Sequence, residues 1–178
     1  ETWSAPRQIS DPGFYCNNAD HILTLRSGRV LLPAHGWVGE RDLHERTSSG
    51  LESFVFYSDD GFRTWCRSVN TMSAPGRGAH EPSIVELNDG RLLCFLRTTL
   101  GRVYEAFSED GGTTWSQPEP GRLVAPDASP VVKRIPQTGD LLAIWNDNYT
   151  PGHHHVGERT PLAVAVSQDE GDSWMNKQ

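Results

Sequence analysis

Short apolar and alternating runs follow one another along this chain, and glycine-centred turns separate them. In the middle of the sequence, runs of strand length cover 83–87, 91–97 and 102–108, and a shorter run follows Trp115. Alternation with a period of two is typical of β-strands, and the Asn-Asp-Gly turn at 88–90 is a strong hairpin signal. No segment shows the 3.6-residue period of an amphipathic helix. The pattern predicts an all-β chain of antiparallel strands.

A polar box of eight residues occurs three times. Its frame is Ser-x-Asp-x-Gly-x-Thr/Ser-Trp, and in the first copy Phe62 stands in the glycine position. Ser and Asp side chains can bond to nearby backbone N–H groups and hold a turn. Because the acidic residue recurs once per repeat instead of gathering at one place, we interpret the boxes as structural. Their defining positions are Ser58, Asp60, Trp65, Ser108, Asp110, Gly112, Trp115, Ser167, Asp169, Gly171 and Trp174.

A glycine hairpin recurs with the box at matched spacing. The hairpin glycines Gly28, Gly90 and Gly139 are 62 and 49 residues apart, and the box tryptophans are 50 and 59 residues apart. Thr2-Trp3 lies 62 residues before Trp65, so we expect the chain to begin inside a fourth box. Four antiparallel strands in about 50 residues describe a blade of a β-propeller, whereas solenoid repeats are shorter or helical.

The repeats predict one partial β-propeller domain over residues 1–178, with about three blades of four-stranded antiparallel sheet. The expected blades are 20–79, 80–126 and 127–178, and 1–19 would be the end of a preceding blade with its connection. A propeller needs at least four blades in a closed ring. The chain is therefore expected to be a piece of a larger propeller.

The strand order puts hairpins and boxes on one face of the predicted propeller and the remaining connections on the other. Those connections carry acids, bases and aromatic side chains, as expected of a pocket for a small molecule or glycan. The alternative is a set of ordinary polar loops. The candidate substrate contacts on this face are Asn18, Asp20, His35, Trp37, His80, Asp127, Asn146 and Asp147.

Composition argues against several other functions. The 178 residues include 16 Lys+Arg against 23 Asp+Glu, a net charge of −7, which argues against nucleic-acid binding. No apolar run approaches the roughly 18 residues that span a membrane. Cys16, Cys66 and Cys94 form no CxxC pair, so neither a disulfide framework nor a zinc site is expected. For the histidines at 153–155 we favour contact with sugar, or no role, over metal binding, and we expect no metal and no cofactor.

The motifs resemble those of exo-α-sialidases. The box is the Asp-box (BNR) repeat, and the segment from His80 to Arg97, with its Glu-Pro start and Gly-Arg hairpin, is similar to a sialidase strand pair. The segments 144–148 and 159–167 are similar to the BNR sialidase-like branch, and the resemblance covers nearly the whole chain. It implies a six-bladed propeller and a glycoside hydrolase that releases terminal sialic acid from glycoconjugates.

The resemblance also implies roles for three residues. Sialidase sites hold three arginines, a Tyr nucleophile with a Glu partner, and an Asp acid/base. By motif position Glu81 is the Glu partner, Arg97 the second arginine and Arg159 the third, while the remaining groups would lie outside these 178 residues. Arginine binds a carboxylate bidentately. A neutral Tyr avoids repulsion by the substrate carboxylate, but with a pKa of ~10 it needs a neighbouring base.

Other interpretations remain open. The only role of Arg97 could be to neutralise Glu81, and the Arg159 side chain could simply be exposed to solvent. The parent protein could instead be a hydrolase or lyase for another acidic sugar such as a uronate, or a propeller that binds glycans without catalysis. We expect no sialidase turnover from the isolated chain, because its active site would be incomplete. The sequence leaves compartment and oligomeric state undecided.

Overall fold

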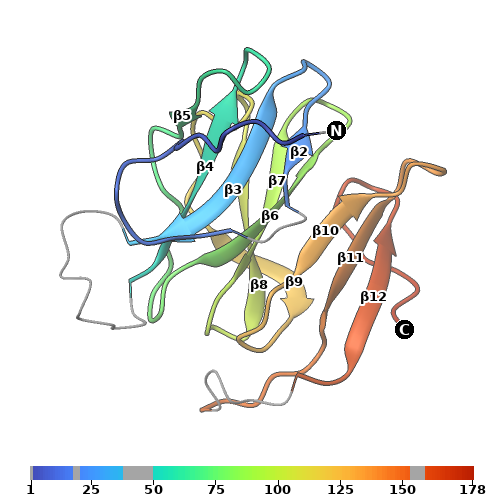
Figure 1. Cartoon of the computed structure of the whole chain (residues 1–178). Helices are drawn as coiled ribbons and strands as arrows, with labels where there is room; N and C mark the ends of the chain where they lie inside the picture. Colours follow the sequence, from blue (N-terminus) through green and yellow to red (C-terminus); the bar gives the residue numbers. More distant parts are fainter. Residues whose placement is uncertain (1, 18–20, 38–49, 153–158) are drawn as a thin grey trace.

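The structure is a computed structural model that describes residues 2–17, 21–37, 50–152 and 159–178. These residues form three antiparallel sheets and contain no helix, as the all-β prediction requires (Figure 1). No helix in this described part could therefore cross a membrane. Asn18, Asp20 and the histidines at 153–155 lie outside the described residues.

The middle sheet contains four strands in sequence order. They are β6 (His80–Glu86), β7 (Leu92–Arg97), β8 (Arg102–Ser108) and β9 (Glu119–Val124). The predicted hairpin joins β6 and β7, where Leu87 N–H donates to the Arg91 carbonyl at 2.8 Å and Gly90 adopts a φ of +92°. The strands agree with the runs expected from the sequence, except that β6 begins three residues earlier.

The third sheet has three strands and a short pairing in the fourth position. Its strands are β10 (Val131–Arg134), β11 (Leu141–Asn146) and β12 (Leu162–Ser167). After the third box, Met175 forms an antiparallel bridge with Val166 of β12. The backbones of Val164 and Gln178 also exchange two hydrogen bonds of 3.1 Å. The end of the chain therefore pairs along the outer edge of this sheet.

The first sheet has an interrupted inner strand. Its outer strands are β3 (Val30–Gly36), β4 (Glu52–Ser58) and β5 (Cys66–Arg67), while β1 (Tyr15–Cys16) and β2 (Leu23–Thr24) both pair with β3. From Cys16 to Leu23 the chain advances seven residues, but their partners His35 and Leu31 are four residues apart. The inner position is therefore shared by two short strands instead of one continuous strand.

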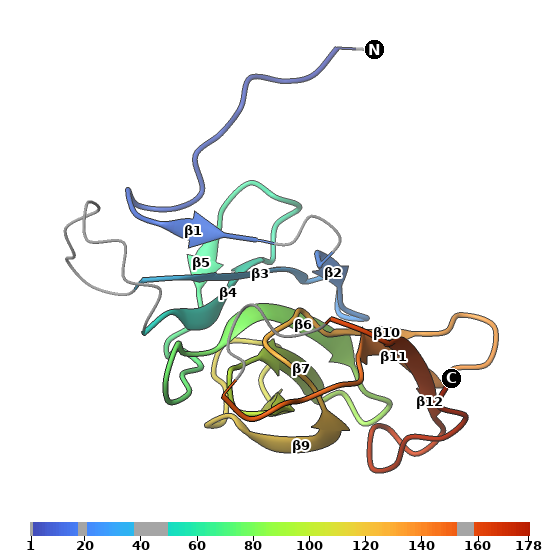
Figure 2. The same ribbon diagram turned by 90° about the horizontal axis from the view of Figure 1, so that it is seen from below.

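The sheets pack side by side, and β6 of the middle sheet contacts β3 of the first sheet and β10 of the third (Figure 2). Every residue of β7 is buried. Leu93 and Phe95 belong to the core shared with the third sheet, whereas Cys94 and Leu96 belong to the core shared with the first. Because side chains alternate across a strand, one sheet supplies both cores. This is the arrangement of neighbouring blades in a partial β-propeller.

The aspartates of the three boxes make closely related hydrogen bonds. In the middle box, Asp110 Oδ1 accepts from the N–H groups of Thr113 and Thr114 at 3.0 and 2.8 Å, and Oδ2 accepts from the Thr114 hydroxyl at 2.6 Å. Asp60 makes the equivalent three bonds. Asp169 accepts from the Ser173 N–H and hydroxyl at 2.8 and 2.5 Å, while the Asp172 N–H donates to the Asp169 carbonyl at 3.2 Å. In the first box Phe62 has a φ of +70°, a left-handed conformation that glycine adopts with less strain.

Candidate functional site

The predicted site residues that the structure describes lie at the edge of the sheets opposite the boxes. At this edge β3, β7 and β11 end, and β6, β10 and β12 begin. Glu81 is the second residue of β6, Arg97 ends β7, Asp127 precedes β10 and Arg159 precedes β12. Antiparallel topology therefore gathers residues that are far apart in the sequence.

A bulge at the start of β6 sets the position of Glu81. His80 pairs with Arg97 and Ser83 pairs with Phe95, so three steps along β6 face two steps along β7. Glu81 has a φ of +49°, which is uncommon for a residue with a side chain. Its Oε1 accepts from Arg97 Nη1 at 2.9 Å, and its Oε2 is buried with no hydrogen-bond partner among the described residues. Strained backbone of this kind clusters at functional sites.

Arg97 lies between two carboxylates. Its side chain is 8% exposed, and its Nε donates to Asp127 Oδ1 at 2.6 Å while Nη1 donates to Glu81. Burial alone would lower the pKa of Arg97, but the bonds to Asp127 and Glu81 raise it above its ordinary value. Arg97 therefore stays charged in a largely buried position.

Asp127 connects three arginines. Its side chain is 3% exposed, and its Oδ2 accepts from Arg77 while its Oδ1 accepts from Arg97. Its backbone carbonyl accepts from Arg159 Nη2 at 3.3 Å. Burial would raise the pKa of Asp127, but Arg97 and Arg77 hold it below its ordinary value. The result is a cationic cluster organised around one buried carboxylate.

Two buried histidines lie beside this cluster. The rings of His35 and His80 stack with centroids 5.5 Å apart and planes 2° apart. His35 Nδ1 accepts from the Glu81 N–H at 3.2 Å, and His80 Nε2 donates to the Arg77 carbonyl at 2.8 Å. Burial lowers the pKa of both rings, that of His35 to about 4. Both imidazoles are therefore uncharged at neutral pH.

Comparison with known proteins identifies the family. A sequence model described as a BNR repeat-like domain matches residues 1–177. The chain belongs to this family. The BNR repeat-like domain is 34% identical over 94 residues to an anhydrosialidase from Macrobdella decora, a match that covers 53% of the chain and 11% of the relative. It is 24% identical over 188 residues to a sialidase from Bacteroides fragilis, covering 98% of the chain and 31% of the relative.

Solved structures share the fold of this BNR repeat-like domain. The NanB sialidase from Streptococcus pneumoniae superposes with a TM-score of 0.57 at 24% identity, over 86% of the chain and 22% of the neighbour. The Trypanosoma rangeli sialidase superposes with a TM-score of 0.58 at 18% identity, over 82% and 22%. The domain thus spans less than a third of the length of each of these relatives and neighbours.

Other predicted contacts of the BNR repeat-like domain have different partners. The Asn146 side chain donates to the Arg159 carbonyl at 2.7 Å, and Asp147 forms an ion pair with Lys177. Trp37 packs on Phe14 with ring centroids 4.4 Å apart. Asn146 therefore helps to hold the segment that carries Arg159.

Sequence reasoning did not select Arg77. This arginine bonds to Asp127 and supplies the carbonyl that His80 contacts. The only signal in the sequence is a basic residue shortly before the His-Glu-Pro segment, which by itself does not reveal a partner 50 residues away. Among the described residues, no group of three or more His, Cys, Asp or Glu side chains could hold a metal ion.

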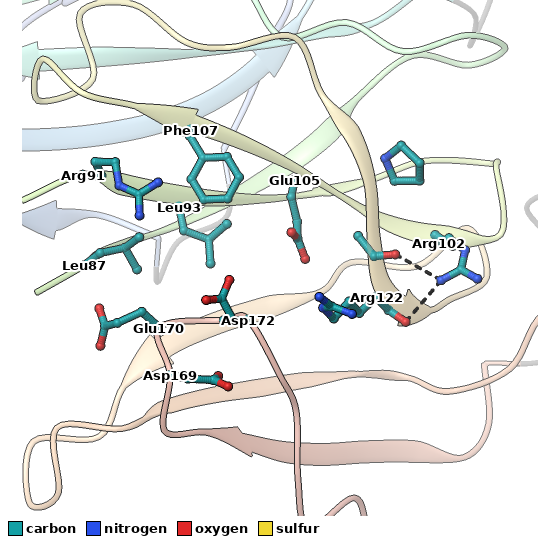
Figure 3. Close-up of a pocket in the computed structure, with 13 residues that line it drawn as sticks. Leu87, Arg91, Leu93, Arg102, Glu105, Phe107, Arg122, Asp169, Glu170 and Asp172 are labelled. Atoms are coloured by element: carbon teal, nitrogen blue, oxygen red, sulfur yellow. Dashed lines mark hydrogen bonds between the residues drawn. The ribbon is translucent and has the colours of Figure 1, made fainter. Parts of the chain in front are cut away.

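A separate cavity of about 440 Å³ lies between the middle and third sheets on the box side (Figure 3). Glu105 of β8 and Asp172 of the third box point into it from facing elements. Glu105 Oε1 is buried with no hydrogen-bond partner among the described residues. Burial and the nearby Asp172 raise the pKa of Glu105 to about 7, although Arg122 acts in the opposite direction. None of the predicted catalytic residues lines this cavity.

Proposed function

We propose that the full-length protein containing this BNR repeat-like domain is a sialidase-like glycosidase that releases terminal sialic acid from glycoconjugates. The observation that carries the proposal is the junction of Glu81, Arg97 and Asp127, with Arg159 bonded to the same aspartate. The names of the relatives, anhydrosialidase and sialidase, support the same class of substrate.

In this proposal Arg97 and Arg159 bind the substrate carboxylate. A guanidinium group offers a planar fork of donors with a permanent charge, which suits a carboxylate. Asp127 fixes the Arg97 fork through Nε, so the arginine needs little reorganisation when substrate arrives. Arg159 is exposed and can approach a ligand directly.

Glu81 serves as the base that activates a tyrosine nucleophile in a retaining mechanism. Its Oε1 is held by Arg97, and Oε2 remains available to accept the phenolic proton. A tyrosine is uncharged before attack, so the substrate carboxylate does not repel it. We assign the tyrosine, an acid/base aspartate and a further arginine to parts of the full-length protein beyond these 178 residues.

The test compares Arg97→Ala, Arg97→Lys and wild type on an α-sialoside in the full-length protein. We expect Arg97→Ala to lower kcat/KM by on the order of 100-fold, and Arg97→Lys to recover little because it lacks the bidentate fork. Arg91→Ala is a matched control, since Arg91 is exposed and pairs with Asp89 in the opposite-edge hairpin. Thermal unfolding of each variant separates lost binding from lost folding.

Sialoside cleavage by Arg97→Ala at the wild-type rate would contradict the proposal, as would a wild type that cleaves neutral glycosides as well as sialosides. Arg159→Ala provides a second test, because its exposed side chain can be removed with little effect on folding. Binding of a glycan without turnover would favour a non-catalytic propeller, and preference for a uronate would favour another acidic sugar.

Intramolecular transfer is a second candidate reaction. One relative is named anhydrosialidase, and a structural neighbour is a leech intramolecular trans-sialidase complexed with 2,7-anhydro-Neu5Ac. Mass spectrometry of the released sugar distinguishes the reactions, because the anhydro product is lighter by one water. Hydrolysis predicts free sialic acid as the product.

A further inference from the structure

His35 of β3 and His21, which lies just before β2, bond to the bulge that carries Glu81. Glu81 and Pro82 form this bulge, and neither has a partner in the register between β6 and β7. The Glu81 N–H donates to His35 Nδ1 at 3.2 Å, and the Pro82 carbonyl accepts from His21 Nδ1 at 2.7 Å. These two side chains thus satisfy the irregular backbone of the neighbouring sheet.

We propose that His35 is a positioning residue that holds the Glu81 backbone so that its carboxylate faces Arg97. The inference rests on the proposed function in one respect: it takes Glu81 to be the base of the sialidase reaction. It goes beyond that function by giving a role to a buried residue that does not itself reach the reacting atoms.

The conformation of Glu81 explains why the bond is needed. A φ of +49° is unfavourable for a residue with a Cβ, and buried N–H groups need an acceptor. Without His35 Nδ1, the bulge would lose the acceptor that compensates for this strain. The Glu81 carboxylate would then leave the position in which it bonds to Arg97 at 2.9 Å.

His35 can accept this bond only while its ring is neutral. Burial and the neighbouring His80 lower its pKa to about 4, Arg97 acts in the same direction, and Glu81 opposes them. The ring is therefore neutral across the neutral range, and the bond from the Glu81 N–H implies the tautomer whose single proton is on Nε2. The backbone of His35 is fixed as well, because Cys16 of β1 pairs with it.

The experiment compares His35→Asn with His35→Gln in the full-length protein. The Asn carbonyl oxygen can occupy the place of Nδ1, whereas a Gln side chain carries its polar atoms further out, near Nε2. We expect His35→Gln to lower kcat by about tenfold with little change in KM, and His35→Asn to recover most of the rate. Both replacements are polar and uncharged, so the cost of burying them is similar.

Equal loss of kcat in the two variants, or no loss in either, would overturn the proposal. Thermal unfolding measured in parallel shows whether a variant is folded, and a variant that fails to fold is replaced by His35→Ser with added imidazole. Rescue of kcat by imidazole would support the positioning role, and failure of rescue in a folded variant would contradict it.

A structural measurement separates this inference from the proposed function. Crystal structures of the two variants should show the Glu81–Arg97 contact kept in His35→Asn and lost in His35→Gln. If wild type cleaves no sialoside but the contact follows this pattern, the proposed function fails while the positioning of Glu81 stands. An unchanged bulge in His35→Gln overturns the inference itself.

Discussion

At the edge of the sheets that carries the boxes, Asp110 accepts hydrogen bonds from groups two to four residues away. At the opposite edge, Asp127 bonds to Arg97, Arg159 and Arg77, which are 30, 32 and 50 residues away. The first kind of carboxylate finds its hydrogen-bond donors within its own turn. The same motif can therefore recur in every blade. The second kind requires segments from more than one sheet to be in place.

Removal of Asp127 should lower the free energy of unfolding more than the other two substitutions described below. Asp127→Ala leaves Arg97 largely buried without one of its two carboxylates, and we expect a loss of about 3–5 kcal/mol of unfolding free energy. Asp127→Asn should lose less, because the amide oxygen can still accept a bond. Urea unfolding measures both, with the exposed Asp89→Asn as control. Equal stability of Asp127→Ala and wild type would show that Asp127 stabilises the fold no more than a carboxylate that holds a local turn.

Glu105 lies between these two kinds of carboxylate. It is largely buried, as Asp127 is, but no arginine among the described residues bonds to its Oε1 (Figure 3). Its pKa in the folded state, about 7, lies above the ordinary value of 4.5, so ionisation destabilises the fold as pH rises through this range. Glu105→Gln should therefore be more stable than wild type at pH 8, by about 3 kcal/mol, with the difference small at pH 4.5. Thermal unfolding at both pH values tests this, and a difference independent of pH would contradict it.

Asp110→Ala should have the smallest effect of the three. It removes bonds to the Thr113 and Thr114 N–H groups in an exposed turn, where water can replace the lost acceptor. We expect a loss of about 1 kcal/mol and unchanged kcat on a sialoside in the full-length protein. A large loss of activity with a folded protein would mean that the boxes do more than hold turns.

Local patterns allowed much of the fold to be predicted from the sequence. Hairpin glycines and boxes located β7, β8 and the turns, because turn chemistry depends on neighbouring residues. The topology then placed Glu81, Arg97 and Arg159 at one edge. The division of the inner strand into β1 and β2 was missed, as was the bond between Arg77 and Asp127, because both depend on contacts between distant segments. The roles of the site residues stay predictions.

The links made by Asp127 also bear on the order of folding. Its partners come from the loop before β6, the end of β7 and the segment before β12, so the cluster closes only after the middle and third sheets have docked. We expect contacts of this kind to form after the folding transition state, where they act mainly on the rate of unfolding. Asp127 would thus slow unfolding and lengthen the lifetime of the native state, while the rate of folding stays nearly the same.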